Sequence, residues 1–327
     1  MNTPALAVSD LRIGIRRDGA PTIDAVEGVS FTVAAGQVLA IVGESGSGKS
    51  LTALALPGLH QPPVTIRSGS IRLEGVELLG LAPAALRRLR GSRIAIVLQD
   101  PMTALNPVQR VQTHLIETIR AHRPMGYEEA RERSRLALAR AGVPEPARRL
   151  QSWPHELSGG LRQRVVIAMA LVNDPAVIVA DEATTALDVT VQGEILREVR
   201  RLARDSGTAF VWITHDLGVV ERIADTVCVM YAGQVVEQGP AGAVLAQPAH
   251  PYTRALLDCV PARQRAGTRL NQIAGAPPSA GQWPSGCRFA ARCPMVRDDC
   301  TRTPSTLSVL EGTDMPRSVR CLHPLTP

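Results

Sequence analysis

Lys49 is the only lysine among the 36 Lys and Arg residues of this 327-residue chain. It lies within Gly43-Glu44-Ser45-Gly46-Ser47-Gly48-Lys49-Ser50, which has the spacing G-x-x-x-x-G-K-S/T and is followed by Leu51. A primary ammonium fits between phosphate oxygens as a compact point charge, whereas a guanidinium is a broad planar fork. Backbone N–H groups of such a loop can surround the same phosphates. The spacing therefore predicts a nucleotide site, although an isolated string of this kind also arises by chance in loops.

A pair of acids follows an apolar run later in the chain. Asp181 and Glu182 end the sequence Val177-Ile178-Val179-Ala180-Asp181-Glu182. A carboxylate at the carboxyl edge of a sheet can hold Mg²⁺ beside a phosphate loop, so we expect Asp181 on the metal side. Glu182 is then placed to polarise an attacking water as general base. By itself, an Asp-Glu pair at a strand end is more often a helix-capping pair.

The elements that must position these residues alternate between strands and helices. We expect strands at 38–42, 93–98, 176–180 and 208–213, helices at 50–56 and 191–205, and hairpins at 68–78 and 227–237. Residues 1–35 are expected to form short strands that feed the same sheet, and residues 128–141 an amphipathic helix ending at Gly142. Alternating strands and helices favour an α/β fold with a largely parallel sheet covered on both faces.

Further motifs accompany the loop and the acid pair. They are Gln99, Ser158-Gly159-Gly160 before a helical run, Ala186-Leu187-Asp188, and His215 after a strand. A serine and two glycines at a helix start expose N–H groups to an anion. Together the ordered set resembles an ATP-binding cassette (ABC) ATPase. The resemblance implies a P-loop NTPase fold with a mainly parallel mixed sheet, an antiparallel β-subdomain and a helical subdomain at about 101–173, all within an ATPase domain at 1–260.

The resemblance also implies a role for each motif. Gly43, Gly46, Gly48 and Lys49 would hold ATP phosphates, and Ser50 would also bind Mg²⁺. Gln99 would sense the metal and the water, and His215 would approach the γ-phosphate. Two such domains would form a head-to-tail dimer in which Ser158-Gly159-Gly160 of one clamps the ATP of the other, with Asp188 at the seam.

Two positions depart from the family pattern. Ile15 stands where an aromatic residue usually stacks on adenine, which leaves Arg16 as a planar substitute. Ala183 replaces the proline that commonly follows the acid pair. Both acids and the histidine are present, so we expect a site competent for hydrolysis.

Two segments resemble one branch of the family, the peptide and nickel importers. They are Gln99-Asp100-Pro101-Met102-Thr103-Ala104-Leu105-Asn106-Pro107 and His250-Pro251-Tyr252-Thr253-Arg254-Ala255-Leu256-Leu257. The sequence 161–171 resembles the first of two paired, non-identical ATPase subunits of dipeptide or oligopeptide permeases. The resemblance implies a heterodimeric ATPase partner, two transmembrane permease subunits and, indirectly, an extracytoplasmic solute-binding protein.

Four of the six cysteines gather in a predicted C-terminal extension at 261–327: Cys287, Cys293, Cys300 and Cys321. The spacing lacks the C-x₂₋₄-C pairs of common zinc modules, yet four thiolates in a short segment suggest one metal centre. The segment resembles the extension of the importer branch, where such cysteines ligate a 4Fe–4S cluster. Zn²⁺ and unligated thiols are the alternatives. Cys228 and Cys259 are interpreted as buried small hydrophobes.

Composition limits the remaining possibilities. No apolar run reaches the length of a membrane span, and no secretory signal is visible at residues 1–5, so we expect the chain in the cytoplasm. The resemblance to an importer subunit implies a peripheral position on the cytoplasmic face of the inner or plasma membrane. The formal charge of +6 comes from arginines interleaved with acids, which is typical of solvated helix faces rather than of nucleic-acid binding. The alternatives are the same ATPase serving nickel or another small solute, and a soluble ABC ATPase acting on DNA or ribosomes.

Overall fold

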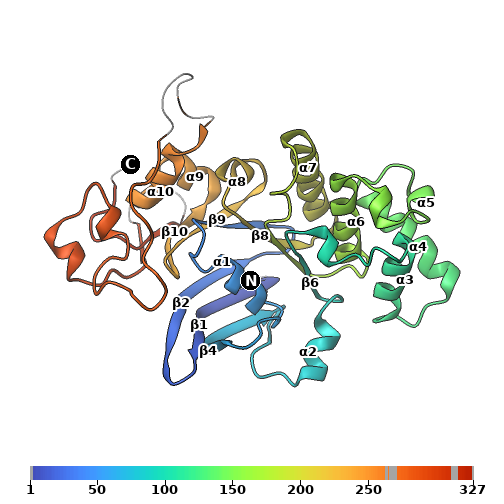
Figure 1. Cartoon of the computed structure of the whole chain (residues 1–327), viewed down its shortest axis with the longest axis horizontal. Helices are drawn as coiled ribbons and strands as arrows, with labels where there is room; N and C mark the ends of the chain where they lie inside the picture. The colour runs from blue at the N-terminus through green and yellow to red at the C-terminus, as the bar shows by residue number, and fades with distance from the viewer. Residues whose placement is uncertain (1–2, 262–263, 265–270, 311–315, 326–327) are drawn as a thin grey trace.

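The computed structural model describes residues 3–261, 264, 271–310 and 316–325, so part of the predicted extension lies outside the described residues. The chain forms an elongated molecule with a sheet at its centre (Figure 1). The helices α3 to α6 gather at one end and the C-terminal residues at the other. None of the helices in the described ranges is long and apolar enough to cross a membrane.

The central sheet has eight strands in the order β11-β12-β10-β9-β3-β8-β7-β6. The pairs from β6 to β9 are parallel, and β9, β10, β12 and β11 pair antiparallel. In chain order the strands are β3 (Val38–Val42), β6 (Ile94–Val97), β7 (Val177–Asp181), β8 (Ala209–Thr214), β9 (Thr226–Tyr231), β10 (Gln234–Pro240), β11 (Ser308–Val309) and β12 (Ser318–Val319). The expected mainly parallel sheet is confirmed.

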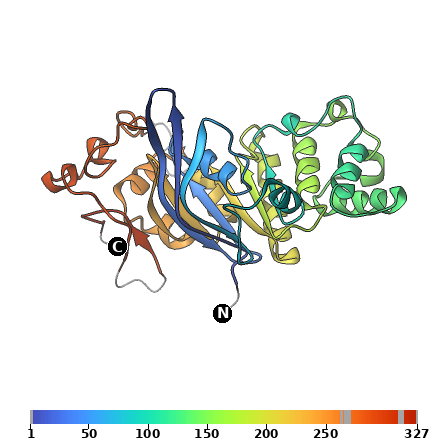
Figure 2. The ribbon, with the colours of Figure 1, turned by 90° about the horizontal axis from the view of Figure 1, so that it is seen from below.

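A second sheet has the order β2-β1-β4-β5 and is antiparallel throughout. Its strands are β1 (Leu6–Arg17), β2 (Ala20–Val33), β4 (Val64–Leu73) and β5 (Val76–Glu77). The expectation that residues 1–35 form short strands of the main sheet was wrong. They form two long strands that cross beside the central sheet (Figure 2). Their alternating buried and exposed residues suit a sheet with one face on the core, whereas the central strands β3 and β8 are buried on both faces.

Helices surround the central sheet, and three of their boundaries follow from capping residues. Ser158 caps α6 and Asp188 caps α7 through their side chains, and α7 ends at Gly207 in the left-handed conformation. The helices are α1 (Lys49–Ala55), α2 (Pro83–Leu89), α3 (Val111–Arg120), α4 (Tyr127–Arg140), α5 (Pro146–Arg149), α6 (Gly159–Leu171), α7 (Val189–Ser206), α8 (Leu217–Ile223), α9 (Ala241–Ala246) and α10 (Pro251–Asp258), with 3₁₀ turns η1 (Pro101–Thr103), η2 (Pro154–Glu156), η4 (Ala290–Arg292) and η5 (Asp298–Thr301). The helices α3 to α6 lie between β6 and β7, and the bounds of about 101–173 for a helical subdomain stay a prediction.

Side chains of the central strands divide between the two faces of the sheet. Alternate residues of β8 show this: Ala209, Val211 and Ile213 belong to the core shared with the antiparallel sheet and α1, whereas Phe210 and Trp212 face the helical side. This period-two alternation lets one strand contribute to two cores. As a result, α1 is held between the two sheets, directly behind the phosphate loop.

The C-terminal residues join the rest of the chain through the central sheet. Val319 of β12 pairs with Glu237 of β10. The Arg317 guanidinium donates to the Glu237 carboxylate at 2.8 Å, and both side chains are buried. The boundary at residue 260 stays a prediction, because strand pairing continues across it.

Candidate nucleotide site

The phosphate loop connects β3 to α1 and depends on glycine at its first position. Gly43 has a φ of +153°, and a Cβ there would lie 2.1 Å from the Met230 carbonyl oxygen. Gly48 has a φ of +99° and precedes α1. Because side-chain-bearing residues rarely adopt these conformations, the loop backbone can follow this path only with glycine at both positions.

The Lys49 side chain lies inside this loop. Its Nζ donates to the carbonyl oxygens of Gly43 and Glu44, both at 2.8 Å, and to Ser47 Oγ at 3.3 Å. Burial lowers the pKa of Lys49, while the carboxylates of Glu182, Asp181 and Glu44 oppose that shift. These acids favour the charged form of Lys49, and a polyphosphate would complete the coordination of its ammonium.

The predicted magnesium side meets the loop at Ser50. The Ser50 hydroxyl donates to Asp181 Oδ1 at 3.3 Å, across 131 positions of sequence. Parallel pairing of β7 with β8, and of β8 with β3, brings the end of β7 to the loop. Burial raises the pKa of Asp181, and the neighbouring Glu182 adds to the shift. A hydroxyl beside a partly desolvated carboxylate is a donor set that suits Mg²⁺.

Glu182 occupies a strained position after β7. Its φ is +50°, an uncommon conformation for a residue with a side chain. Its Oε1 lies 3.2 Å from His215 Nδ1, and its Oε2 accepts from the Thr185 hydroxyl at 3.4 Å. The structure thus brings two predicted residues together and adds Thr185, which no sequence motif had indicated. An oriented carboxylate next to a histidine suits general-base chemistry.

The Ser158-Gly159-Gly160 motif begins α6 and lies against the start of α7. A Cβ on Gly160 would lie 2.4 Å from Val191 Cγ1, and Val191 N–H donates to the Asp188 carboxylate at 3.0 Å. Ser158 and Gly159 are exposed. Among the described residues, no hydrogen bond or ion pair joins this motif to the phosphate loop. The motif and Asp188 therefore meet at the starts of α6 and α7.

Two further predicted residues have fewer contacts. Gln99 follows β6 and is exposed, and no hydrogen bond of its side chain is present in the described ranges. Ile15 lies in β1, partly buried, opposite Ile23 of β2 and Val64 of β4. The roles suggested for Gln99 and for Ile15 or Arg16 stay predictions.

The four C-terminal cysteines line one small cavity, together with His250 and His323. All four are thiols without a disulfide, and burial raises the pKa of Cys287, Cys293 and Cys321. Around a tetrahedral Zn²⁺ the sulfurs would lie about 3.8 Å apart, from the usual Zn–S bond length. In the described residues, the group with ligand atoms all within 4.8 Å of one another is Asp299, Cys300 and His323, which contains only one of the four. The cluster and the zinc alternative both stay predictions.

The other two cysteines differ from each other. Cys228 is buried in β9, and burial raises its pKa to about 12, which confirms its interpretation as a small hydrophobe. Cys259 follows α10 and is only partly buried, so the same interpretation was wrong for it.

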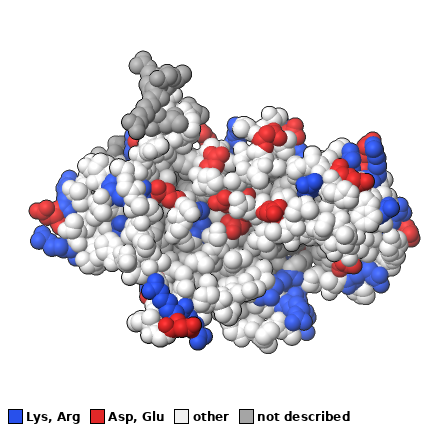
Figure 3. All heavy atoms as spheres, viewed as in Figure 1, with Lys and Arg blue, Asp and Glu red and all other residues white. Residues whose placement is uncertain are grey.

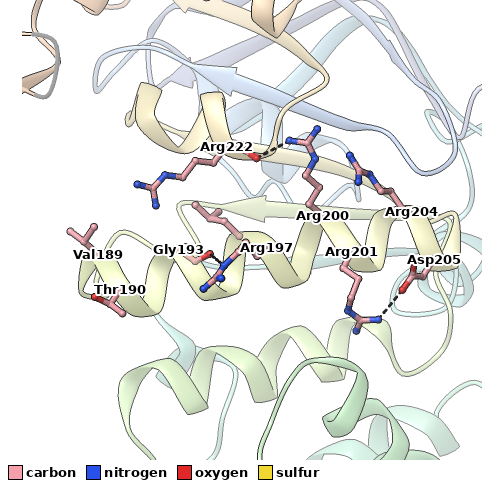
Figure 4. A pocket seen from close by; sticks show the side chains of 10 residues that line it. Val189, Thr190, Gly193, Arg197, Arg200, Arg201, Arg204, Asp205 and Arg222 are labelled. Atoms are coloured by element: carbon pink, nitrogen blue, oxygen red, sulfur yellow. Dashed lines mark hydrogen bonds and ion pairs between the residues drawn. The ribbon is translucent and has the colours of Figure 1, made fainter.

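A cavity of about 690 Å³ lies elsewhere, along α7 and beside Arg222 at the end of α8. Figure 4 shows that its arginines diverge: Arg200 and Arg204 point to one side of α7, and Arg197 and Arg201 to the other. Arg201 is also neutralised by Asp205 at 2.8 Å. Because the guanidinium groups do not converge on one point, we assign no ligand to this cavity.

Comparison with known proteins agrees with this geometry. Residues 26–185 match the sequence model of the ABC transporter family, and residues 236–300 match that of the oligopeptide/dipeptide transporter C-terminal region. Two solved structures are similar over 72–75% of the chain: a dimeric bacterial ABC transporter cassette, MJ0796 (27% identity, TM-score 0.64, 98% of that chain), and cbiO1 from Clostridium perfringens (29% identity, TM-score 0.65, 91% of that chain).

Curated relatives cover more of the chain. The oligopeptide transport ATP-binding protein OppD of Salmonella typhimurium is 45% identical over 98% of this chain and 94% of its own length. The dipeptide transport protein DppD of Bacillus subtilis is 44% identical over 91% of this chain and 89% of its own length. OppD of Mycobacterium tuberculosis is 50% identical over 94% of this chain, but the chain spans only 50% of that relative. The chain therefore belongs to the ABC transporter family of ATP-binding proteins, in the group that carries the oligopeptide/dipeptide transporter C-terminal region.

Proposed function

We propose that this chain is the ATP-hydrolysing subunit of an ABC importer and that it energises the uptake of dipeptides or oligopeptides through partner membrane permeases. The observation that carries the proposal is the convergence of Lys49, the Ser50–Asp181 contact and the Glu182–His215 contact at one end of the sheet. The match of residues 236–300 and the names of the relatives support peptides as the cargo.

The residues divide the work of hydrolysis. The loop N–H groups and Lys49 bind the phosphates, with Glu44, Ser45, Ser47 and Leu51 completing the loop. Ser50, Asp181 and Gln99 are the ligands proposed for Mg²⁺, which when bound neutralises phosphate charge. Glu182 accepts a proton from the attacking water, and His215 orients the Glu182 carboxylate on the γ-phosphate side.

We further propose that the complete site requires a second, non-identical ATPase subunit. Ser158 and Gly159 are exposed, as expected for a surface that closes over the partner's ATP. The dimeric cassette MJ0796 supports pairing of two such domains, and the resemblance of residues 161–171 to the first of two paired subunits supports a non-identical partner. The segment after Gln99 would receive a coupling helix from the permease, so this chain would lie at the cytoplasmic face of the membrane. Closure of the dimer around ATP would then move those helices.

For the four-cysteine cavity we propose a 4Fe–4S cluster held by Cys287, Cys293, Cys300 and Cys321, with Zn²⁺ as the alternative. The convergence of four thiols in one cavity supports a metal centre. The resemblance of the extension to that of the importer branch supports the cluster. Anaerobically purified protein should contain iron and acid-labile sulfide and absorb broadly near 400 nm. Stoichiometric zinc without iron would contradict the cluster.

The nickel or small-solute alternative keeps the same ATPase, and only identification of the solute-binding partner separates the two. An ABC ATPase acting on DNA or ribosomes belongs to a different class. The face in Figure 3 carries acidic groups near its middle and separate basic groups at its ends and along its lower edge, without a continuous basic surface. This distribution gives no support to nucleic-acid binding on that face.

The test is capture of tagged Glu182→Gln protein, trapped with ATP in detergent-solubilised cells. We expect a second ATPase and two polytopic membrane proteins, and wild-type protein without ATP serves as the control. A co-purified binding protein can then be screened against dipeptides, oligopeptides and Ni²⁺. Recovery of ribosomes or nucleic acid without membrane proteins would overturn the transport function.

A further inference from the structure

Arg292 of the C-terminal extension forms a bidentate ion pair with Glu44, the second residue of the phosphate loop. Arg292 Nη1 lies 2.7 Å from Glu44 Oε2, and Nη2 lies 2.9 Å from Glu44 Oε1. The Arg292 side chain is only 4% exposed. Two parallel, charge-assisted hydrogen bonds from a buried guanidinium fix the geometry of a carboxylate far better than a surface pair does.

The Arg292 guanidinium is itself held in place on its other edges. Its Nε donates to the Ala274 carbonyl oxygen at 2.9 Å, and Nη2 also reaches the Ile273 carbonyl oxygen at 3.4 Å. Nη1 lies 3.3 Å from the Tyr231 hydroxyl. The side chain therefore has one orientation, so little conformational entropy opposes its contact with the loop.

Glu44 is also held through its backbone. Its N–H donates to the Tyr252 hydroxyl at 2.9 Å, and its carbonyl oxygen accepts from Lys49 Nζ at 2.8 Å. Phe289 of the extension packs on Tyr252, with ring centroids 5.3 Å apart. The position of the Lys49 ammonium thus depends on Glu44, and Glu44 is held by the extension.

We propose that Arg292 is a positioning residue for ATP binding: through Glu44 it holds the phosphate loop in the conformation that presents Lys49 to the phosphates. The C-terminal extension is then part of the nucleotide site. Arg292 contacts the loop rather than the reacting groups Glu182 and His215, so its loss affects nucleotide affinity and KM, while kcat at saturating MgATP is preserved.

The test uses the full chain and MgATP binding measured by calorimetry or with a fluorescent ATP analogue. We expect Arg292→Ala to weaken binding about 10-fold, equivalent to about 1.4 kcal/mol. Glu44→Ala should weaken it by a similar factor, and the double variant should bind no more weakly than the weaker single variant, because both remove the same contact. Arg292→Lys should restore part of the affinity, since an ammonium can contact one carboxylate oxygen.

Arg288→Ala is the matched control. Arg288 is another buried arginine of the extension, but its carboxylate partner is Glu27 in β2, at 2.6 Å, and its guanidinium lies over the Trp283 ring. We expect its MgATP affinity to stay within about 2-fold of wild type. Circular dichroism and thermal unfolding establish that each variant is folded.

Three results would overturn the proposal: unchanged affinity in folded Arg292→Ala, equal weakening in Arg288→Ala, or additive losses in the double variant. Should Arg292→Ala fail to fold, Glu44→Ala and Arg292→Lys decide the question. Unchanged affinity in both of these variants would refute the role of the contact. In the assembled complex, a fall in kcat without a rise in KM would also contradict it.

Discussion

Replacing Glu182 by glutamine is the most direct test of the hydrolytic site. The amide has nearly the same shape as the carboxylate, and its oxygen can still accept one of the two hydrogen bonds, from His215 Nδ1 at 3.2 Å or from Thr185 Oγ1 at 3.4 Å. What the variant loses is the negative charge and the basicity. We therefore expect the fold and ATP binding to survive.

The expected size of the effect follows from the role of the group. A positioned general base contributes about 10²- to 10⁴-fold to rate, and each tenfold is about 1.4 kcal/mol of barrier. The loss is therefore about 3–5 kcal/mol in the activation free energy. Glu182 also adds to the raised pKa of Asp181, after burial. Removing its charge makes Asp181 easier to ionise, so Mg²⁺ binding should not weaken.

The assay is phosphate release by the assembled complex at saturating MgATP, with KM measured separately. Glu128→Gln is the control, because Glu128 is an exposed residue of α4 whose contact is Arg131 at 3.3 Å. We expect a large fall in kcat for Glu182→Gln and none for Glu128→Gln. Turnover within about 3-fold of wild type, or a loss confined to KM, would refute Glu182 as the base.

Three further predictions follow from local contacts. Lys49→Arg should weaken MgATP binding about 100-fold or more in a folded protein, because a guanidinium cannot occupy the buried ammonium position. Affinity retained in calorimetry would contradict this prediction. Arg317→Ala should lower the free energy of unfolding by about 3–5 kcal/mol, because it leaves the buried Glu237 carboxylate without its cation. Denaturant titrations measure this change, and a decrease below about 1 kcal/mol would contradict the prediction. Burial lowers the pKa of His250 to about 3 in the folded protein, whereas its ordinary pKa is 6.5. Below pH 6.5 the histidine of the unfolded chain takes up a proton that the folded protein does not, so the free energy of unfolding should fall as pH drops from 6.5 toward 3. His250→Asn, which can still cap α10, should flatten this pH dependence in unfolding titrations, and an unchanged slope would argue against the buried neutral histidine.

Much of the fold could be predicted because its strongest signals are local. The strands β3, β7 and β8 are short apolar runs, and α7 has a capping aspartate at its start and a glycine at its end. Residues 1–35 were correctly expected to be strands, but their sheet was misassigned. Strand propensity is a property of neighbouring residues, whereas the choice of pairing partner depends on contacts that are distant in sequence, as in β1 with β4.

The sequence by itself determined the phosphate loop, the acid pair and the family, because each motif encodes its own backbone geometry: glycines for the loop, a carboxylate at a strand end, and a serine at a helix start. Tertiary structure alone decided which other side chains hold these motifs in place. Thr185 reaches Glu182 only through a turn, and Arg292 reaches Glu44 across 248 positions. An arginine in a short 3₁₀ turn of the extension has no local signature of its partner. Its role follows only from the packing of the extension against the cassette, which places the guanidinium beside the phosphate loop.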